Sequence, residues 1–330
     1  MPISYKENML LVLQHKEPEY MPLIEDFDQA YPRGLDFVNE APAIPGPPVQ
    51  DWFGQYWTYE PNINGANPTP GMHLIEDITT WRDVMKFPDL DKLDWEGHAA
   101  KDTAGWDREH RMSRITIGFG LWERLFSTMD FMECLIALKE EPEACYDFFG
   151  AVADHKIRLY ERVIQYYHPD QVVMHDDYGN SSSMFMSPET WRELIKPHLA
   201  RVIKSITDQG VFYEHHCCGY MAPILEEVAD LGATSFNTVH VSNKPAELKK
   251  KLGHKISFFG GFDNQYIDMP TTTEEMVRKH VRETIDQMAP GGNWCPRCVN
   301  ADPLKHTWIN DELLHYGVEH YYRGPRPEQI

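Results

Sequence analysis

The chain of 330 residues has few basic residues for its size, and this shortage excludes several classes of partner. Its 31 Lys and Arg stand against 51 Asp and Glu, which gives a formal net charge of −20 at pH 7. Such a charge repels the phosphate backbone of nucleic acids and the anionic surface of a membrane. We therefore expect neither nucleic acid nor a membrane as a partner.

Long apolar runs and dense cysteines are lacking as well. The N-terminal stretch MPISYKENMLLVLQHKEPEY contains only a short apolar run flanked by charges, which fits neither a signal peptide nor a membrane span. We therefore expect a cytoplasmic protein. Six cysteines are too few for a disulfide scaffold, but four of them form two close pairs, Cys217 with Cys218 and Cys295 with Cys298. In a reducing compartment, such pairs indicate metal or redox chemistry.

The pattern of apolar residues indicates an α/β fold. From about Ile115 onward, short β-branched or aromatic runs alternate with longer helical patterns, as where QVVMHDD (171–177) precedes a helical segment with Ser187 as N-cap and Pro188 at its first position. With MPLIEDF (21–27) and a strand near Gln55–Tyr59, about eight such units are counted. This predicts one TIM-like (β/α)8 barrel domain over residues 1–330. A doubly wound open sheet is the alternative.

Residues 41–72 form an N-terminal extension rich in Pro, Gly and Asn with interleaved aromatic residues. A segment of this length and composition is typical of a lid or binding loop, or else of a disordered insertion. Its five aromatic residues favour an ordered segment. We predict that three of them, Trp52, Tyr56 and Trp57, bind the substrate.

Polar residues gather where the predicted strands end. In a parallel barrel, these ends meet at one mouth, where catalytic groups are found. The residues concerned are Asp176 and Asp177, His215 to Cys218, Asn237 and His240, Gly260, Gly261 and Asp263, and Cys295 and Cys298. We predict Asp177, rather than Asp176, and His240 as catalytic residues, and Tyr178 and Asn237 as substrate-binding residues.

The stretch YEHHCCGY (213–220) has the donor atoms of a metal site. The strand period of two places either His215 with Cys217 or His216 with Cys218 on one side, and each pair offers zinc a nitrogen and a sulfur. A cysteine of the last strand, Cys295 or Cys298, would supply a third ligand. Three protein ligands with one open position are typical of catalytic zinc. The alternatives are a closed four-thiolate site, a redox pair in CPRC (295–298), or a strand end without metal.

Four segments carry a resemblance to a known family. They are DDYGNSSSMFMSPETWRELIKPHLARVI (176–203), HCCGYMAPILEEVADLGA (216–233), ELKKKLGHKISFFGGFDNQ (247–265) and APGGNW (289–294). Their order and spacing resemble the uroporphyrinogen decarboxylase superfamily, particularly its zinc-dependent, corrinoid-linked methyltransferase branch. The resemblance implies a TIM-like barrel and a zinc ion held by His216, Cys218 and Cys295. Because the His and Cys residues are doubled here, His215, Cys217 and Cys298 are alternative ligands.

The resemblance also implies a reaction. A methyl group would move between a small methoxy, methylthio or methylamino compound and the cobalt of a corrinoid carried by a separate protein. The alternatives are methylation of a thiol from a methyl-corrinoid, decarboxylation of a small acid, and a zinc-stabilised binding protein without turnover. Residues 1–81 contain a single arginine, Arg33, whereas a substrate with many carboxylates needs an arginine cluster. We therefore expect a neutral or weakly charged substrate, and a homodimer is compatible with the sequence.

Overall fold

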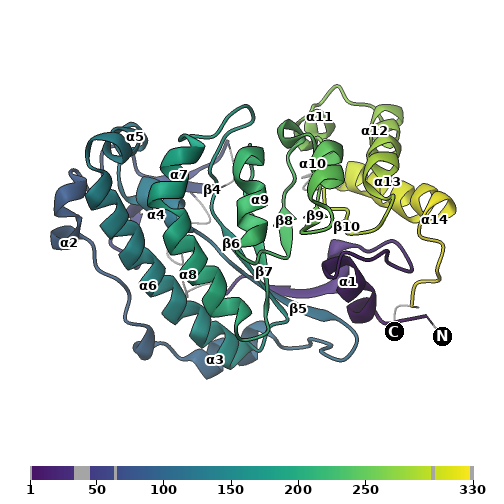
Figure 1. The fold of residues 1–330 in the computed structure, drawn as a ribbon, viewed down its shortest axis with the longest axis horizontal. Coiled ribbons are helices and arrows are strands. Elements are labelled where there is room, and N and C mark those ends of the chain that lie inside the picture. Colours follow the sequence, from purple (N-terminus) through teal and green to yellow (C-terminus); the bar gives the residue numbers. More distant parts are fainter. Residues whose placement is uncertain (1, 33–44, 63–64, 299–301, 328–330) are drawn as a thin grey trace.

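The computed structural model describes residues 2–32, 45–62, 65–298 and 302–327, and a parallel sheet of seven strands runs through it (Figure 1). The strands are hydrogen-bonded in the order in which they follow one another along the chain. They are β1 (Phe27–Ala30), β5 (Met112–Ile117), β6 (Gln171–His175), β7 (Phe212–His216), β8 (Ser235–Asn237), β9 (Ser257–Phe259) and β10 (Trp294–Cys295).

Helices lie between successive strands and cover the outer face of the sheet (Figure 1). The α-helices are α1 (Tyr5–Leu13), α2 (Trp81–Val84), α3 (Trp95–Asp102), α4 (Leu121–Thr128), α5 (Phe131–Glu140), α6 (Pro142–Tyr167), α7 (Pro188–Leu194), α8 (Lys196–Thr207), α9 (Ala222–Asp230), α10 (Pro245–Leu252), α11 (Asn264–Asp268), α12 (Glu274–Met288), α13 (Pro303–Leu314) and α14 (Tyr316–His320). The 3₁₀ helices are η1 (Ile24–Asp26), η2 (Ile78–Thr80), η3 (Leu90–Lys92) and η4 (Val241–Asn243). In the described part of the chain, none of these helices is both long and apolar enough to span a membrane.

Local sequence signals set the helix ends as predicted. The hydroxyl of Ser187 accepts a hydrogen bond from the backbone N–H of Thr190 at 3.0 Å, and Pro188 is the first residue of α7. Gly210, which separates α8 from β7, has a φ of 77°, a backbone conformation that glycine adopts at little cost. β7 therefore begins at a defined residue, and its last residue, His216, lies at the C-terminal end of the sheet.

The architecture confirms a TIM-like barrel in a single domain. The strand order has no reversal, whereas a doubly wound sheet reverses its order at a switch point. Near the N-terminal ends of the strands, α1 packs into the barrel with Phe27 of β1 and Cys295 of β10, which are the two strands at the edges of the hydrogen-bonded order. This small apolar core closes that end, so the opposite end is the mouth.

One strand that the sequence analysis counted towards the barrel lies elsewhere. The described residues contain seven parallel strands, and the segment near Gln55–Tyr59 belongs to a separate antiparallel sheet. That sheet consists of β2 (Val49–Gln50), β3 (Tyr56–Glu60) and β4 (Gly65–Pro68). Short strands with aromatic residues suit an antiparallel sheet as well as a parallel one, so the local pattern did not separate the two.

The antiparallel sheet gives the N-terminal extension an ordered structure, although residues 41–44 and 63–64 of the predicted loop lie outside the described residues. The indole N–H of Trp57 donates to Asp51 Oδ2 at 3.0 Å. Arg124 of α4 lies 3.6 Å from the same carboxylate oxygen, and its guanidinium carbon lies 3.8 Å from the ring centroid of Phe53. The sheet is therefore anchored to the helix that follows β5.

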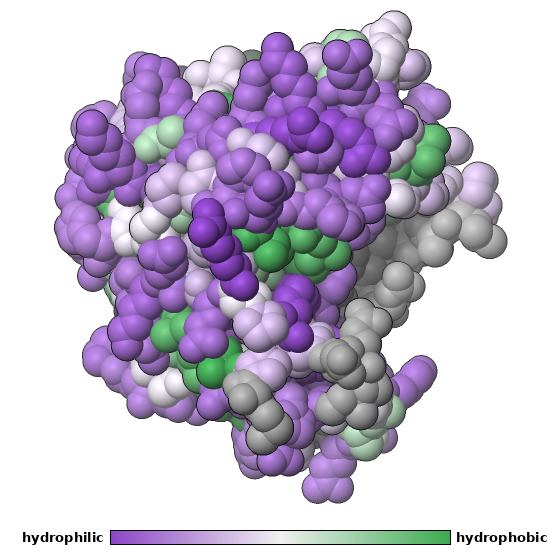
Figure 2. Space-filling model, turned by 90° about the vertical axis from the view of Figure 1, so that its right-hand side faces the viewer, coloured by the Kyte–Doolittle hydropathy of each residue, from purple (hydrophilic) through white to green (hydrophobic). Residues whose placement is uncertain are grey.

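The face that carries the C-terminal helices is mostly hydrophilic, with apolar side chains confined to small patches (Figure 2). Ion pairs contribute to this surface, as where Arg278 of α12 contacts Asp311 and Glu312 of α13 at 3.1 and 3.0 Å. Such a surface agrees with the acidic composition of the chain and distinguishes this face from the strand ends described next.

Candidate metal centre at the barrel mouth

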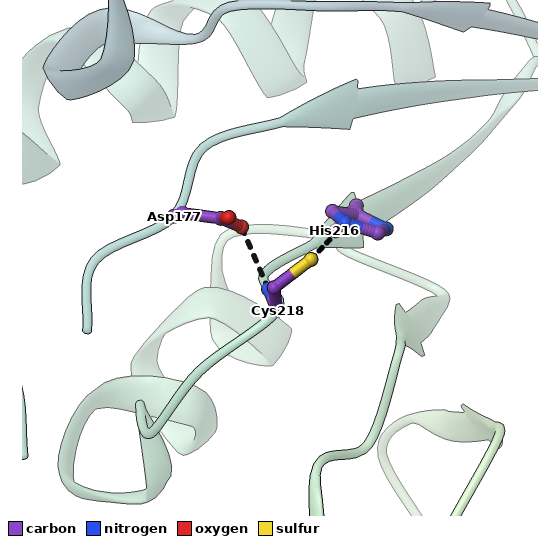
Figure 3. Close-up of side chains that lie close together, drawn as sticks. All are labelled: Asp177, His216 and Cys218. Atoms are coloured by element: carbon purple, nitrogen blue, oxygen red, sulfur yellow. Dashed lines mark hydrogen bonds between the residues drawn. The ribbon is translucent and has the colours of Figure 1, made fainter. Parts of the chain in front are cut away.

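Three side chains with metal-binding atoms converge where β6 and β7 end (Figure 3). Asp177 follows β6, His216 is the last residue of β7, and Cys218 comes two residues later. One donor atom from each lies within 4.8 Å of the other two. Nε2 of His216 is 3.1 Å from Sγ of Cys218, and the backbone N–H of Cys218 donates to Oδ1 of Asp177 at 2.6 Å.

Two glycines hold the loops of this group against each other. A Cβ on Gly219 would lie 1.9 Å from the carbonyl oxygen of Gly179, and a Cβ on Gly179 would lie 2.3 Å from that of Tyr220. Neither position has room for a larger residue without a backbone shift. The N–H of Tyr220 also donates to the carbonyl oxygen of Asn180 at 2.8 Å. These contacts fix the spacing between Asp177 and Cys218.

A buried polar network orients His216 from below. Its Nδ1 lies 3.1 Å from Oδ1 of Asn237, whose amide nitrogen donates to Oε1 of Glu214 at 3.0 Å. Glu214 in turn pairs with the guanidinium of Arg114, and both side chains are fully buried. Because the amide oxygen accepts, the proton of His216 resides on Nδ1, and the lone pair of Nε2 faces Cys218. A metal bound at Nε2 requires this tautomer.

The donor set fits a zinc ion. Zinc binds nitrogen, thiolate sulfur and carboxylate oxygen at bond lengths of about 2.0 to 2.3 Å, and a tetrahedral ion therefore spaces its ligand atoms roughly 3.5 Å apart. The three donor atoms already lie within 4.8 Å of one another. Three protein ligands would leave one position for another ligand. Magnesium and calcium fit less well, because they prefer oxygen ligands alone.

The electrostatics of the mouth favour a cation. Burial, followed by repulsion from Asp177 and Asp176, raises the pKa of Glu123 of α4, whose Oε1 accepts the backbone N–H of Asp177 at 3.3 Å. Partial enclosure of the Cys218 thiol, together with the nearby Asp177 and Glu123, raises its pKa as well. Burial lowers the pKa of His216, which stays neutral. A divalent ion would reverse the unfavourable charge of these groups and displace the thiol proton.

Several predicted site residues lie in or beside the group. Asp177, predicted as catalytic, is one of its donors, and Asn237, predicted to bind substrate, contacts His216. Tyr178 is buried and donates its hydroxyl to Oδ2 of Asp176 at 2.8 Å, and it is not one of the three donors. His240 caps η4, with Nδ1 2.8 Å from Ser242 Oγ, and is not part of the group. The roles proposed for these residues stay predictions.

The predicted aromatic residues of the extension differ in exposure. Trp57 is 2% exposed, and its ring centroid lies 5.4 Å from that of Phe119, which follows β5. Trp52 and Tyr56 are half-buried. Contact of these three side chains with a substrate stays a prediction, in which Trp57 would act from within the packed sheet.

The other cysteines and His215 lie outside the three-donor group. His215 and Cys217 point to the outer face of β7, where Nδ1 of His215 is 3.1 Å from the Tyr213 hydroxyl. Cys295 is fully buried in the core that α1 forms with the strands, so the structure does not bring it to His216. Cys298 is half-buried beyond the end of β10, and its thiol donates to Oδ1 of Asn264 at 3.0 Å.

Two residues at the mouth were not predicted. Glu123 lies in the first turn of α4 beside Asp177. Arg297 follows β10 and donates from Nη1 to Oδ1 of Asn237 at 2.6 Å. Arg297 lies between the two cysteines of CPRC, at a predicted strand end, and this position could have indicated that it belongs to the site. Glu123 had no local signal, because it lies within an ordinary helical pattern.

The comparisons with known proteins agree with this architecture. The sequence model for uroporphyrinogen decarboxylase matches residues 74–295, more than half of the chain. The chain therefore belongs to the uroporphyrinogen decarboxylase family. A solved structure described as a methyltransferase from Methanosarcina mazei superimposes with a TM-score of 0.64 over 95% of this chain and 99% of that chain, at 12% sequence identity. This likeness concerns the fold alone.

Two curated relatives point to one branch of the family. The chain is 30% identical over 250 residues to methylated-thiol–coenzyme M methyltransferase of Methanosarcina mazei, covering 68% of this chain and 65% of that protein. It is 25% identical over 119 residues to methylcobamide:CoM methyltransferase MtaA of Methanosarcina barkeri, covering 35% of this chain and 34% of the relative. The chain thus spans less than two thirds of the length of either relative. The resemblance to the corrinoid-linked methyltransferase branch is confirmed.

Proposed function

We propose that the protein transfers a methyl group between a small compound and the cobalt of a corrinoid carried by a partner protein, with zinc held at the mouth. The observation that best supports this proposal is the group of Asp177, His216 and Cys218, which lies at the strand ends of the parallel sheet. The chain also belongs to the uroporphyrinogen decarboxylase family. The names of the two relatives, which mention a methylated thiol and a methylcobamide, support this reaction class.

Each residue of the centre has a distinct part in this proposal. His216 would bind the zinc through Nε2, Cys218 through its thiolate and Asp177 through a carboxylate oxygen. Zinc supplies Lewis acidity, which lowers the pKa of a bound thiol or polarises the heteroatom that carries the methyl group. Asn237 holds the proton of His216 on Nδ1, and Glu214 holds the Asn237 amide in place. These contacts keep Nε2 directed at the ion.

Cys298 competes with Asp177 for the position of the third ligand, because the sequence has two cysteines in CPRC (295–298). Asp177 already lies in the donor group, whereas Cys298 contacts Asn264 instead. The variants Asp177→Asn and Cys298→Ala separate the two donor sets. We expect Asp177→Asn to weaken zinc binding and Cys298→Ala to leave it near the wild-type value. The opposite result would assign the third position to Cys298.

The reaction itself is tested with free methylcobalamin and small thiols, followed by the change in corrinoid absorbance. Zinc-loaded wild type should consume methylcobalamin in the presence of a thiol, and His216→Ala should lose at least a hundredfold in rate, since metal-based activation of this kind is worth several kcal/mol. Cys134→Ala, a buried cysteine of α5, is the matched control and should keep the rate. Unchanged rates after complete chelation of zinc would overturn the proposal, and release of CO2 from a small acid by the chelated protein would favour the decarboxylase alternative.

A further inference from the structure

Arg297 is a half-buried cation at the mouth. In the part of the chain that the structure describes, it forms no ion pair, and its Nη1 donates a hydrogen bond to Oδ1 of the neutral Asn237 amide at 2.6 Å. Other enclosed arginines differ. Arg114 pairs with Glu214, and Arg326 pairs with Asp26 at 2.5 Å. A half-buried guanidinium normally has its charge balanced, so the missing counter-charge at Arg297 indicates a place for an anion.

The place of Arg297 relative to the metal donors is well defined. Oδ1 of Asn237 accepts from Arg297 and also lies 3.1 Å from Nδ1 of His216, so one amide oxygen separates the guanidinium from the imidazole. The positive charge of Arg297 contributes to the lowered pKa of His216, after burial and the neighbouring His175. An anion on Arg297 would thus lie within the reach of a small molecule bound at the metal centre.

The charges of the mouth are divided between its two sides. Asp177 and Glu123 lie beside β6 and α4, before β7 in the strand order, whereas Arg297 follows β10, beyond β8 and β9. His216 and Cys218 stand between them. Consider a small molecule whose reacting heteroatom lies at the centre and whose other end is acidic. Its acidic group avoids the carboxylates only if it points towards Arg297.

We propose that Arg297 binds an acidic group, a carboxylate, sulfonate or phosphate, of the small substrate whose heteroatom occupies the Asp177, His216 and Cys218 centre. The inference rests on the proposed function and narrows its substrate class from neutral to singly acidic compounds. A guanidinium has five N–H donors, of which one goes to Asn237, so an edge is left for a two-bond contact with an anion. Arg33, to which the expectation of a neutral substrate referred, lies outside the described residues.

A matched pair of probes tests the inference. 3-(Methylthio)propanoate and 3-(methylthio)propanamide differ in charge but hardly in size, and isothermal titration calorimetry gives the affinity of zinc-loaded protein for each. Wild type should bind the acid roughly tenfold to a hundredfold more tightly than the amide, the usual effect of a charged hydrogen-bond partner. Arg297→Gln keeps an N–H for Asn237 and should bring the ratio near one. Arg297→Lys should keep part of the preference.

The ratio of the two affinities guards against a merely misfolded variant, because general damage lowers both affinities. Arg201→Gln, which removes an exposed arginine of α8 paired with Asp154, is the control and should keep the wild-type ratio. Equal affinity of wild type for the two probes, lack of binding by the acid, or a preference that survives in Arg297→Gln would overturn the inference.

A second pair of probes separates this inference from the proposed function. Propanesulfonate and propanesulfonamide lack the thioether that would contact the metal centre, so their binding can be measured with metal-free protein. A preference for the sulfonate that disappears in Arg297→Gln, in a protein that takes up no zinc, would support the anion site and reject the zinc mechanism. Zinc uptake and methyl transfer without any preference for acids would support the proposed function and reject the anion site at Arg297.

Discussion

The ends of β7 and β10 carry the same kind of residue and use it differently. Each end has two cysteines, but Cys218 after β7 lies at the mouth beside His216, whereas Cys295 in β10 is buried against Met9 of α1 and Phe27 of β1. The first thiol belongs to the candidate metal centre. The second belongs to the small core that closes the other end of the barrel.

Strand tilt explains the difference. Following the register from His216 through Asn237 and Phe259 leads to Cys295, so these residues are aligned by hydrogen bonds. Barrel strands tilt by about 35–45° and lie about 4.8 Å apart, so crossing three strand pairs along the register moves a residue roughly 8–10 Å along the barrel axis. The same register therefore places Cys295 well below the mouth, and residues a little further along the chain, such as Arg297, reach the level of Asn237.

The largest expected effect concerns zinc itself. We expect purified wild type to hold about one zinc ion per chain, Cys218→Ala to hold almost none, and Cys295→Ala to keep its zinc, because only the first change removes a donor at the mouth. Metal analysis of the reduced, freshly prepared proteins gives the answer. Zinc lost from Cys295→Ala while the fold is intact by circular dichroism would break the comparison and restore Cys295 as a ligand.

The next effect comes from the amide that orients His216. Asn237→Leu removes the acceptor of the Nδ1 proton, and loss of a hydrogen bond that orients a metal ligand typically costs 10- to 100-fold in metal affinity. Competition with a zinc-sensitive dye measures it. Asn264→Leu is the matched control after β9, since that amide contacts Cys298 rather than a donor of the group. A larger loss in Asn264→Leu than in Asn237→Leu would point to Cys298 as a ligand.

Thiol reactivity should differ between the two strand ends and depend on pH. The pKa of Cys218 is raised by partial enclosure and by the carboxylates Asp177 and Glu123, so its thiolate fraction grows about tenfold per pH unit through pH 7 to 9. Alkylation of metal-free protein by iodoacetamide should follow that slope at Cys218 and be absent at buried Cys295. Peptide mass spectrometry reads both sites. A rate at Cys218 that levels off below pH 8 would show that its pKa is not raised.

The smallest effect concerns stability. Cys295→Ser places a hydroxyl among apolar side chains and should lower the free energy of unfolding by about 1–3 kcal/mol, whereas Cys218→Ser in metal-free protein should change it by less than about 0.5 kcal/mol. Urea denaturation of both variants tests this. Equal losses would mean that the two thiols sit in similar surroundings, against the structure.

The sequence predicted the barrel because apolar runs and helix signals are local. Ser187 and Pro188 marked a helix start that the structure reproduces. The strand near Gln55–Tyr59 was wrongly assigned to the barrel, since its alternation of aromatic residues suits an antiparallel sheet equally and its partners β2 and β4 lie close in the chain. Strand type depends on pairing, which a single segment does not encode.

The site was predictable as far as its spacing is local. His216 and Cys218, two residues apart on one strand end, converge as expected. That Asp177 joins them depends on the contact between the loops after β6 and β7, which no local pattern contains. The expectation of a neutral or weakly charged substrate used the scarcity of arginine in residues 1–81. The cation at the mouth, Arg297, instead follows the last strand.

The backbone contact between Gly179 and Gly219 has a practical consequence for handling the protein. Because backbone contacts hold the two loops together, removal of a bound metal should leave the scaffold folded, and refilling the site should need no refolding step. The empty form could then be purified, loaded with cobalt or cadmium in place of zinc, and studied by visible absorption or nuclear magnetic resonance. Zinc gives no signal in these spectra, whereas the signals of bound cobalt or cadmium depend on the atoms that ligate the ion.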